Sequence, residues 1–563
     1  MTIHVLSSDV ISKIAAGEVV ERPSSVVKEL IENSLDAGAA QVSIEVSGGG
    51  TQLIRVSDNG SGISGDEIEL AFERHATSKI TSESDIEGIS SLGFRGEALP
   101  TIASVADVSV LTKYRDEMTG TAIRLENGVL INKASQGCPQ GTTINVKNLF
   151  QNVPARLKFL KSASTESGHI SQTVAQYSLA FPEVKFTLVM NGRTSLRSPG
   201  NGSLRDALVE VYGLQTGQSM LEITGGDVSV SGFVSPSSVS RSNRNYLSFF
   251  VNRRWVQSKA LNFAVEEAYQ NMLMTGKHPI VALNISLPSG EIDVNVHPAK
   301  REIKFRNERE VFTAVQKAVR ETLVGFSPVP SMRISSSLSA SPAPTSIPFP
   351  STGGLQSANT ELPVLQPYHR TEPSAQLPIL RVIGQLQNSY VLGEGPDGMY
   401  IIDQHAAHER VRFEKIRREQ EMRSVEVQGL LEPISIDLTA QQSELINSEG
   451  KLLTETGFTL EQFGERTFLL RAVPTVLKQQ DVIPVLTEIL DFLEDGQRSE
   501  WQERIAASLA CHGAIKAGQA LDQREMEELL RQLEGTASPR TCPHGRPTVI
   551  HLSSAHLERE FGR

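Results

Sequence analysis

The sequence predicts a multidomain α/β protein. At 563 residues the chain is too long for one hydrophobic core, and its length predicts roughly three or four domains. Alternating apolar and polar segments, typical of strands, occur between segments with helical periodicity. A stretch rich in serine, proline and threonine, residues 327–376, has no apolar periodicity and divides the chain into two globular units.

The composition is that of an ordinary globular protein, with 39% apolar and 21% charged residues. We find no apolar run long enough to span a bilayer and no start like a signal peptide, so a cytoplasmic location is expected. Three cysteines exclude a disulfide framework. The net charge of −11 means that DNA binding would need a local basic surface and be weak and salt-sensitive.

The Ser/Pro-rich stretch is predicted to be a flexible linker between the two globular units, with residues 328–376 as its bounds. Its root-mean-square reach is on the order of 40 Å. The chain before it is expected to hold two domains, residues 1–204 and 205–327, and residues 377–563 form a separate unit.

The segment RPSSVVKELIENSLDAGA predicts the first helix. Pro23 suits its first turn and Gly38 its C-terminal stop. Apolar residues fall on one side, and Glu29, Asn33 and Asp36 form a narrow stripe on the other. This stripe is either a functional face or a solvated one.

Two predicted strands follow, QVSIEV and LIRVS, and the second delivers Asp58 at its end. Beyond it, Gly60, Gly62 and Gly65 spell GxGxxG, the dinucleotide-binding pattern, but a lone match is weak. The segments HATSKI and SLGFRGEAL, and the Gly-Thr pair that opens the strand TTINV, favour a different nucleotide site. No GxxxxGK[ST] is present, which excludes a P-loop.

The motifs NSLDA, DNGSG, GFRGEAL and the later GT occur in the order and spacing of a known family. This ordered set resembles the ATPase domain shared by MutL proteins, DNA gyrase, Hsp90 chaperones and sensor histidine kinases. The match covers about the first 150 residues. It implies a GHKL-type α/β sandwich that binds ATP and Mg²⁺.

The resemblance assigns roles to single residues. Glu29 would be the general base for the water that attacks the γ-phosphate, and Asn33 would supply an oxygen to Mg²⁺. Asp58 would accept a hydrogen bond from the adenine amino group. A lid near residues 93–96, at the start of a helix beginning near Glu97, would face the phosphates with its N–H groups. The nucleotide-binding residues implied in this way are Asn33, Asp58, Gly62, Thr77, Lys79, Gly93, Phe94, Arg95, Gly96 and Thr142.

Residues 205–327 are predicted to form a second α/β domain. FFVNRRWVQ (residues 249–257) and EIDVNVHPAKREIKF (residues 291–305) are interpreted as alternating strands around the helix-like ALNFAVEEAYQNML. VNVHPAKREIKF and FFVNRR resemble a MutL signature, which implies a ribosomal-S5-like domain whose Lys300 reaches the ATP phosphates as part of the catalytic set. The alternative is a surface lysine after a turn. Basic residues that either contact DNA phosphates or are simply solvated are Arg156, Lys158, Lys161, Arg253 and Arg254.

In the C-terminal unit, DQHAAHERVRFE follows a buried-strand pattern, MYIID. On a helix, His405 and Glu409 share a face, and imidazole and carboxylate are ligands for zinc or a similar ion. The alternative is that Asp403 caps a charged, solvated helix.

Two of the three cysteines lie beside histidines. Cys511 is in the helical pattern SLACHGAIKAG, where a small core residue is the simpler interpretation. Cys542 and His544 are two apart in the loop RTCPHGRPT, which has little core to fill. With the DQHA histidine and glutamate they suggest a Zn²⁺ or Mn²⁺ site.

These motifs resemble those of the nuclease-competent branch of MutL: DQHA followed by Glu409 and Glu414, ACHGAIKA, CPHGRP and the terminal FGR. The resemblance implies that Asp403 and Glu409 are catalytic. It also implies a metal set of Asp403, His405, Glu409, Cys511, Cys542 and His544. The family usually has a basic residue where His512 stands, so the role of His512 stays open. His408 occupies a position that the motif leaves free, and Glu414 points elsewhere and is interpreted as structural.

The hexapeptide QGLLEP, Gln428 to Pro433, resembles the peptide by which repair proteins bind the replicative sliding clamp; a strand-entry segment is the alternative. Together the resemblances imply a homodimeric, ATP-switched mismatch-repair endonuclease that acts on DNA with the mismatch-recognition protein MutS. The alternative is a nuclease-inactive, ATP-gated scaffold with a structural metal site.

Overall fold

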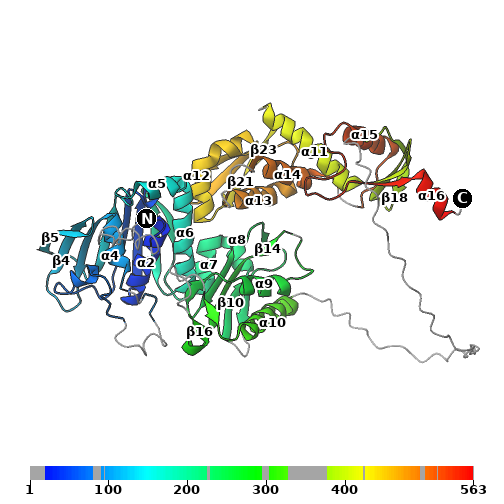
Figure 1. Cartoon of the computed structure of the whole chain (residues 1–563). Helices are drawn as coiled ribbons and strands as arrows, with labels where there is room; N and C mark the ends of the chain where they lie inside the picture. Colours follow the sequence, from blue (N-terminus) through cyan, green and yellow to red (C-terminus); the bar gives the residue numbers. More distant parts are fainter. Residues whose placement is uncertain are drawn as a thin grey trace, which may run out of the picture.

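A computed structural model describes residues 20–79, 91–93, 96–224, 229–274, 276–293, 303–326, 377–422, 425–494, 501–515 and 518–561. Helices and sheets alternate throughout these residues, which confirms the predicted α/β class (Figure 1). Phe94, Arg95, Lys300 and the predicted linker lie outside the described residues. In the described part of the chain, no helix has the length and apolar character needed to cross a membrane.

The first unit is built on an eight-stranded sheet with the order β5-β4-β3-β6-β2-β1-β7-β8. Inward and outward side chains alternate along β1, as expected for a sheet with one covered face. The strands are β1 (Gln41–Ser47), β2 (Leu53–Asp58), β3 (Asp107–Lys113), β4 (Gly120–Glu126), β5 (Val129–Gln136), β6 (Gly141–Lys147), β7 (Lys185–Met190) and β8 (Arg193–Arg197).

Helices cover one face of this sheet and contribute apolar side chains to the hydrophobic core. The predicted first helix is confirmed as α2 (Pro23–Asp36), with proline in its first turn and Gly38 at a φ of 71° just beyond its end. Val26, Val27, Leu30 and Ile31 of α2 are fully buried. The other helices of this unit are α4 (Ala98–Val105), α5 (Pro154–Phe159) and α6 (Ala163–Ala180), and α6 packs against α2.

The second unit contains a five-stranded sheet with the order β13-β12-β15-β10-β9. The prediction of one alternating strand over residues 249–257 is wrong, because the backbone turns at Asn252 and Arg253, whose φ angles are 49° and 68°. Two successive positive φ angles make a tight hairpin turn. The strands are β9 (Leu221–Thr224), β10 (Ser229–Val234), β12 (Leu247–Val251), β13 (Arg254–Val256) and β15 (Val281–Ser286).

Two helices of this unit pack against each other beside its sheet, α9 (Lys259–Ala268) and α10 (Glu308–Phe326). The ends of the predicted strand over residues 291–305 pair as β16 (Ile292–Asp293) and β17 (Lys304–Phe305). The remaining elements are α7 (Leu204–Tyr212), α8 (Leu214–Ser219) and the pair β11 (Ser240–Arg241) and β14 (His278–Pro279).

The C-terminal unit has two hydrophobic cores. One lies beside a four-stranded sheet, β18 (Arg381–Leu386), β19 (Tyr390–Gly395), β20 (Gly398–Asp403) and β24 (Val549–Ser553), with α15 (Gln523–Glu534). The other joins the three-stranded sheet β21 (Val427–Asp437), β23 (Thr467–Pro474) and β22 (Thr459–Gln462) to α12 (Ala440–Glu455), α13 (Val482–Glu494) and α14 (Trp501–Gly513). Helix α11 (Gln404–Glu421) packs against both α14 and α15, and α16 (Ser554–Glu560) ends the described chain.

The N- and C-terminal units contact each other where α12 packs on α6 (Figure 1). The two units also contact each other through hydrogen bonds to α13. The Tyr246 hydroxyl donates to Glu494 at 3.0 Å, and the backbone N–H of Ser242 donates to Asp491 at 2.9 Å. Burial raises the pKa of Asp491 to about 6, and burial together with the neighbouring Asp491 carboxyl raises the pKa of Glu494 to about 8.

Candidate functional site

A cavity of about 880 Å³ lies beside the exposed side of α2, between the end of β2 and the start of α4. Its size is that of small-molecule and cofactor sites. The walls combine carboxylates, amides, one lysine and glycine backbone. All the predicted nucleotide-site residues that the structure describes line it: Glu29, Asn33, Asp58, Gly62, Thr77, Lys79, Gly93, Gly96 and Thr142.

Asp58 is the carboxylate at the deep end of β2. Its Oδ2 accepts a hydrogen bond from Ser34 Oγ at 3.0 Å, and its Oδ1 accepts from the N–H groups of Gly60 at 2.9 Å and Thr142 at 3.3 Å. Burial raises the pKa of the Asp58 carboxyl despite these bonds. The side chain is therefore held in one orientation, as a group that recognises a base edge must be.

Lys79 joins two of the polar residues of α2 that line the cavity. Its Nζ lies 2.9 Å from Asn33 Oδ1 and 2.6 Å from Asp36 Oδ2. Asp36 also accepts hydrogen bonds from the N–H groups of Leu92, at 2.8 Å, and Gly93, at 3.0 Å. We did not predict this anchoring of the lid segment, although Asp36 lies three residues after Asn33 on the same stripe. The Asn33 oxygen and the adjacent carboxylate are the hard ligands that suit Mg²⁺.

Two glycines are required where the chain closes around the cavity. A Cβ on Gly62, whose φ is 75°, would lie 2.0 Å from the carbonyl oxygen of Lys113. A Cβ on Gly96, at a φ of 63°, would lie 2.4 Å from the carbonyl oxygen of Ala76. Both positions therefore exclude a side chain on conformational and steric grounds.

The second candidate site begins at the junction of β20 and α11. Asp403 caps α11, because its Oδ1 accepts from the N–H groups of His405 at 2.9 Å and Ala406 at 3.0 Å. In the first turn of the helix, His405 Nε2 lies 3.2 Å from Glu409 Oε1 of the next turn, and His405 Nδ1 donates to the carbonyl of Ile515 at 2.8 Å. The hydrogen bond to Glu409 raises the pKa of His405.

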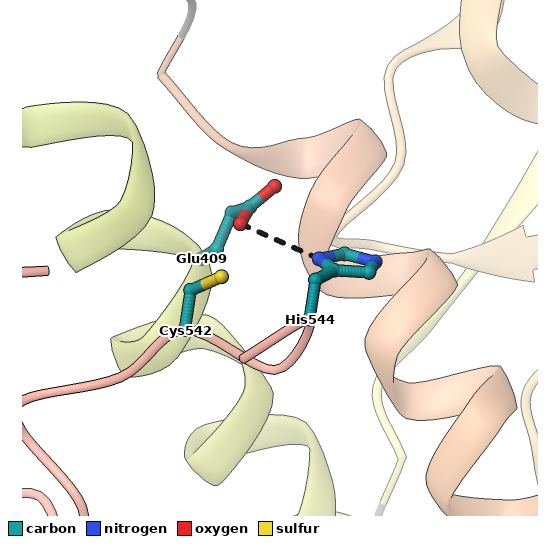
Figure 2. Close-up of side chains that lie close together, drawn as sticks. All are labelled: Glu409, Cys542 and His544. Atoms are coloured by element: carbon teal, nitrogen blue, oxygen red, sulfur yellow. Dashed lines mark ion pairs between the residues drawn. The ribbon is translucent and has the colours of Figure 1, made fainter. Parts of the chain in front are cut away.

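Glu409, Cys542 and His544 converge from α11 and the loop before β24 (Figure 2). Their ligand atoms lie within 4.8 Å of one another, and His544 Nδ1 is 3.6 Å from Glu409 Oε2. Cys511 of α14 also hydrogen-bonds to Glu409. Carboxylate, imidazole and thiol groups in this arrangement fit a Zn²⁺ site.

The electrostatics of this cluster centre on the buried glutamate. Burial raises the pKa of the Glu409 carboxyl, but hydrogen bonds from His405, His544 and Cys511 outweigh it and hold the pKa well below its usual range. Burial and the neighbouring Glu409 raise the pKa of Cys511 to about 12. An ion at the site would have to supply the charge that converts this thiol to a ligating thiolate.

Three residues that the sequence left open have other partners. His408 accepts from the N–H of Ile515 at 2.8 Å, and burial next to Arg412 lowers its pKa to about 4. His512 Nε2 lies 3.2 Å from Glu488. The Glu414 carboxylate accepts from the N–H of Ala537 at 2.9 Å, which is a structural role.

The helix predicted over SLACHGAIKAG ends earlier than expected, at Gly513. The backbone of Ile515 binds His405 through its carbonyl and His408 through its N–H, so neither group is used in a helical bond. Histidines of α11 thus determine where α14 stops.

Two residues of α11 hold the loop that carries Cys542 and His544. Glu414 binds its beginning at Ala537, and Arg410 Nε donates to the carbonyl of Thr541 at 2.5 Å. Arg410 was not predicted as part of the site. Its spacing of one residue from Glu409 carried no signal, since adjacent helical positions face different directions.

Of the five candidate DNA-contacting basic residues, Arg156 donates to the carbonyl of Val20 at 3.1 Å, and the other four divide into two groups. Arg254 is buried and donates to the carbonyl of Ser91, and Arg253 pairs with Glu183, so the solvated interpretation is wrong for Arg254. Lys158 and Lys161, in and just after α5, are exposed.

Comparisons with known proteins match three parts of the chain to family models. Residues 21–155 match the model described as histidine kinase-, DNA gyrase B- and HSP90-like ATPase. Residues 208–324 match the C-terminal domain of DNA mismatch repair proteins, and residues 383–521 match the MutL C-terminal dimerisation domain. The first unit is therefore a GHKL ATPase domain, and the cavity beside α2 is its ATP chamber.

Relatives of full length identify the family. The chain is 40% identical to the DNA mismatch repair protein MutL of Desulforudis audaxviator over 575 residues, covering 100% of this chain and 99% of that protein. It is 39% identical to MutL of Methanothrix thermoacetophila, with the same coverage. A crystal structure of the N-terminal domain of a DNA repair protein matches 56% of this chain and 98% of that one, at 27% identity and a TM-score of 0.50. The chain belongs to the MutL family of DNA mismatch repair proteins.

Proposed function

We propose that this chain couples ATP binding and hydrolysis to metal-dependent nicking of one DNA strand during mismatch repair. The observation that carries the nuclease part is the convergence of His405, Glu409, Cys511, Cys542 and His544 from three separate segments. A nuclease centre of this kind needs no sequence readout, because it contacts the phosphodiester backbone.

In the proposed metal centre, Glu409 is the central ligand and His405, Cys511, Cys542 and His544 surround it. Zn²⁺ or Mn²⁺ bound there would polarise phosphoryl oxygens and lower the pKa of an attacking water. Asp403 holds the first turn of α11 in place, and we assign its carboxylate to the reaction ion.

A second function is compatible with the same donor set. Two thiols and an imidazole, one thiol fully buried, are also typical of structural zinc. In that case the chain would be an ATP-gated scaffold that recruits other enzymes. The nicking assay in the Discussion distinguishes the two functions.

In the ATP chamber, we assign Glu29 as the general base and Asn33 as the oxygen ligand of Mg²⁺. Asp58 would accept from the adenine amino group, supported by its fixed and buried position. Lys79, now held by Asn33 and Asp36, would turn toward the phosphates. Phe94, Arg95 and Lys300 remain proposed nucleotide contacts.

The homodimer is proposed to form through the outer face of the four-stranded sheet. Leu392, Ile401 and Ile550 lie directly opposite one another on β19, β20 and β24, and Ile550 is 57% exposed. The other face, with Val391 and Ile402, is buried against the helices. Leu392 and Ile401 are half-buried, and an apolar row that is open to solvent in this way is typical of an association surface.

Ile401→Glu and Ile550→Glu are expected to convert the dimer to monomer, because each places a charge in the apolar row. Sedimentation velocity of the full chain measures the change. Val324→Glu, at an exposed position on α10, is the matched control and should leave the dimer intact. A dimer that survives both sheet variants would show that association uses another surface.

The sliding clamp is proposed to bind Gln428–Pro433. In β21 the pairing with β23 is interrupted between Gly429 and Ile434, and Leu431 in this bulge is 100% exposed. The segment thus offers an apolar side chain outside the sheet, as docking into an apolar pocket requires.

Leu431→Ala is expected to weaken binding to purified clamp at least about tenfold, since a buried anchor residue contributes more than about 1.4 kcal/mol. Fluorescence anisotropy with labelled clamp measures the affinity. Val427→Ala, exposed on the same strand but outside the motif, serves as the control. Equal affinity of the two variants would contradict the clamp assignment.

MutS and DNA are the remaining proposed partners, and family membership supports both. Lys158 and Lys161 are the exposed basic residues that we assign to DNA phosphates.

A further inference from the structure

Behind the nucleotide chamber, three buried polar side chains are linked to Glu29. Lys28 Nζ lies 3.2 Å from Glu29 Oε1 and 3.0 Å from Glu32 Oε1. The Tyr177 hydroxyl of α6 donates to the same Glu32 oxygen at 2.6 Å. Glu32 is 1% exposed, Tyr177 2% and Lys28 5%, so these groups are removed from water.

Such burial requires a reason, because an ammonium group in a protein core is costly unless it is paired. Lys28 and Glu32 do not line the chamber, whereas Glu29 does. The network therefore does not touch a nucleotide. Its link to the chamber is through the Glu29 carboxylate.

We infer that Lys28, Glu32 and Tyr177 form a positioning network that fixes the Glu29 carboxylate for its proposed role as general base. This inference rests on that role. Lys28 binds one carboxylate oxygen, Oε1, and so limits rotation of the side chain while the group remains at the chamber wall. Tyr177 and Glu32 in turn hold the ammonium group in place.

The positions of the three network residues follow from the fold. Lys28 and Glu32 are four residues apart and adjacent on α2, where an ion pair forms readily. Tyr177 approaches from α6, which packs against α2. The orientation of Glu29 therefore depends on the packing of two helices, and a misplacement of about 1 Å can cost about 100-fold in rate.

The test compares Lys28→Met, Lys28→Arg and Tyr177→Phe in the full chain. Lys28→Met is expected to lower the kcat for ATP roughly 10- to 100-fold, with the Kd for a non-hydrolysable ATP analogue changed less than about threefold. Lys28→Arg should restore part of the kcat, because it keeps the charge. Tyr177→Phe should lower kcat several-fold, and its effect should not add to that of Lys28→Met, since both act through one network.

Tyr269→Phe is the matched control. Tyr269 is a buried tyrosine whose hydroxyl donates to the carbonyl of Ser235 in the second unit. This change removes a comparable hydrogen bond without touching α2, so kcat should stay at the wild-type value.

The Glu29→Ala variant distinguishes a failure of the positioning network from a failure of the base assignment. If Glu29→Ala is inactive and Lys28→Met keeps the wild-type kcat, the positioning network is wrong and the base assignment stands. A Glu29→Ala protein with full turnover overturns both. Loss of analogue binding in Lys28→Met and Tyr177→Phe alike would also overturn the network, because it would indicate a structural role only.

Discussion

Asp403→Asn and Glu409→Lys are each expected to reduce Mn²⁺-dependent nicking of supercoiled circular DNA by at least about 100-fold. That is the upper end of the loss found when a group that only supports a ligand is removed. Glu409 is the residue on which His405, His544 and Cys511 converge. A lysine there replaces the central carboxylate with a positive charge, which would repel a metal cation. Conversion of supercoiled to open-circular DNA on agarose gels measures the rate.

The Asp403 variant has a close internal control. Asparagine caps helices about as well as aspartate, so the start of α11 should be kept. Asp522→Asn makes the same change at the cap of α15, away from the cluster, and should nick like wild type. If wild type does not nick, or if both variants nick equally well, the assignment of this cluster as a nuclease centre is wrong.

Glu29→Ala is expected to bind ATP with near wild-type affinity and to lose hydrolysis by about 10²- to 10⁴-fold, the usual contribution of a general base. The remaining chamber residues, including Asn33 and Asp58, would still hold the nucleotide. Phosphate release under single-turnover conditions and equilibrium binding of labelled ATP separate the two effects.

Glu45→Ala is the control for the ATPase. Glu45 lies on the exposed side of β1, pairs with Arg55 and does not line the chamber. Its removal should change neither binding nor turnover. Unimpaired turnover in Glu29→Ala would exclude Glu29 as the base.

The sequence predicted the ATP chamber more completely than the candidate metal centre. Several motifs in a fixed order predict a particular backbone geometry, and every described residue that they implied lines one cavity. What was missed there, Asp36 as an anchor and the burial of Lys28 and Glu32, depends on contacts with the lid segment and with α6. Such contacts join positions far apart in the chain and leave no local periodicity.

At the metal centre, helical spacing correctly placed His405 beside Glu409. The sequence presented capping and metal binding as alternatives for Asp403 and its helix. In the structure Asp403 caps α11, and the same helix contributes to the metal cluster, so the alternatives are compatible. The approach of Cys542 and His544 depends on the fold of a loop more than a hundred residues later, which spacing alone does not determine.

The contact between the two units also contains two carboxyl groups whose pKa values are raised. Asp491 is buried there, and its Oδ1 has no hydrogen-bond partner among the described residues. Their pKa values are raised in the contact, so the joined form binds more protons than the separated form. Charged and titratable groups facing the pair are Arg241, Tyr246, Lys277 and Glu488.

The sign of this linkage is fixed by the direction of the shifts. The contact is most stable below the ordinary carboxyl pKa and weakens as pH rises through the raised values. Separation of the two units would therefore release protons to solvent.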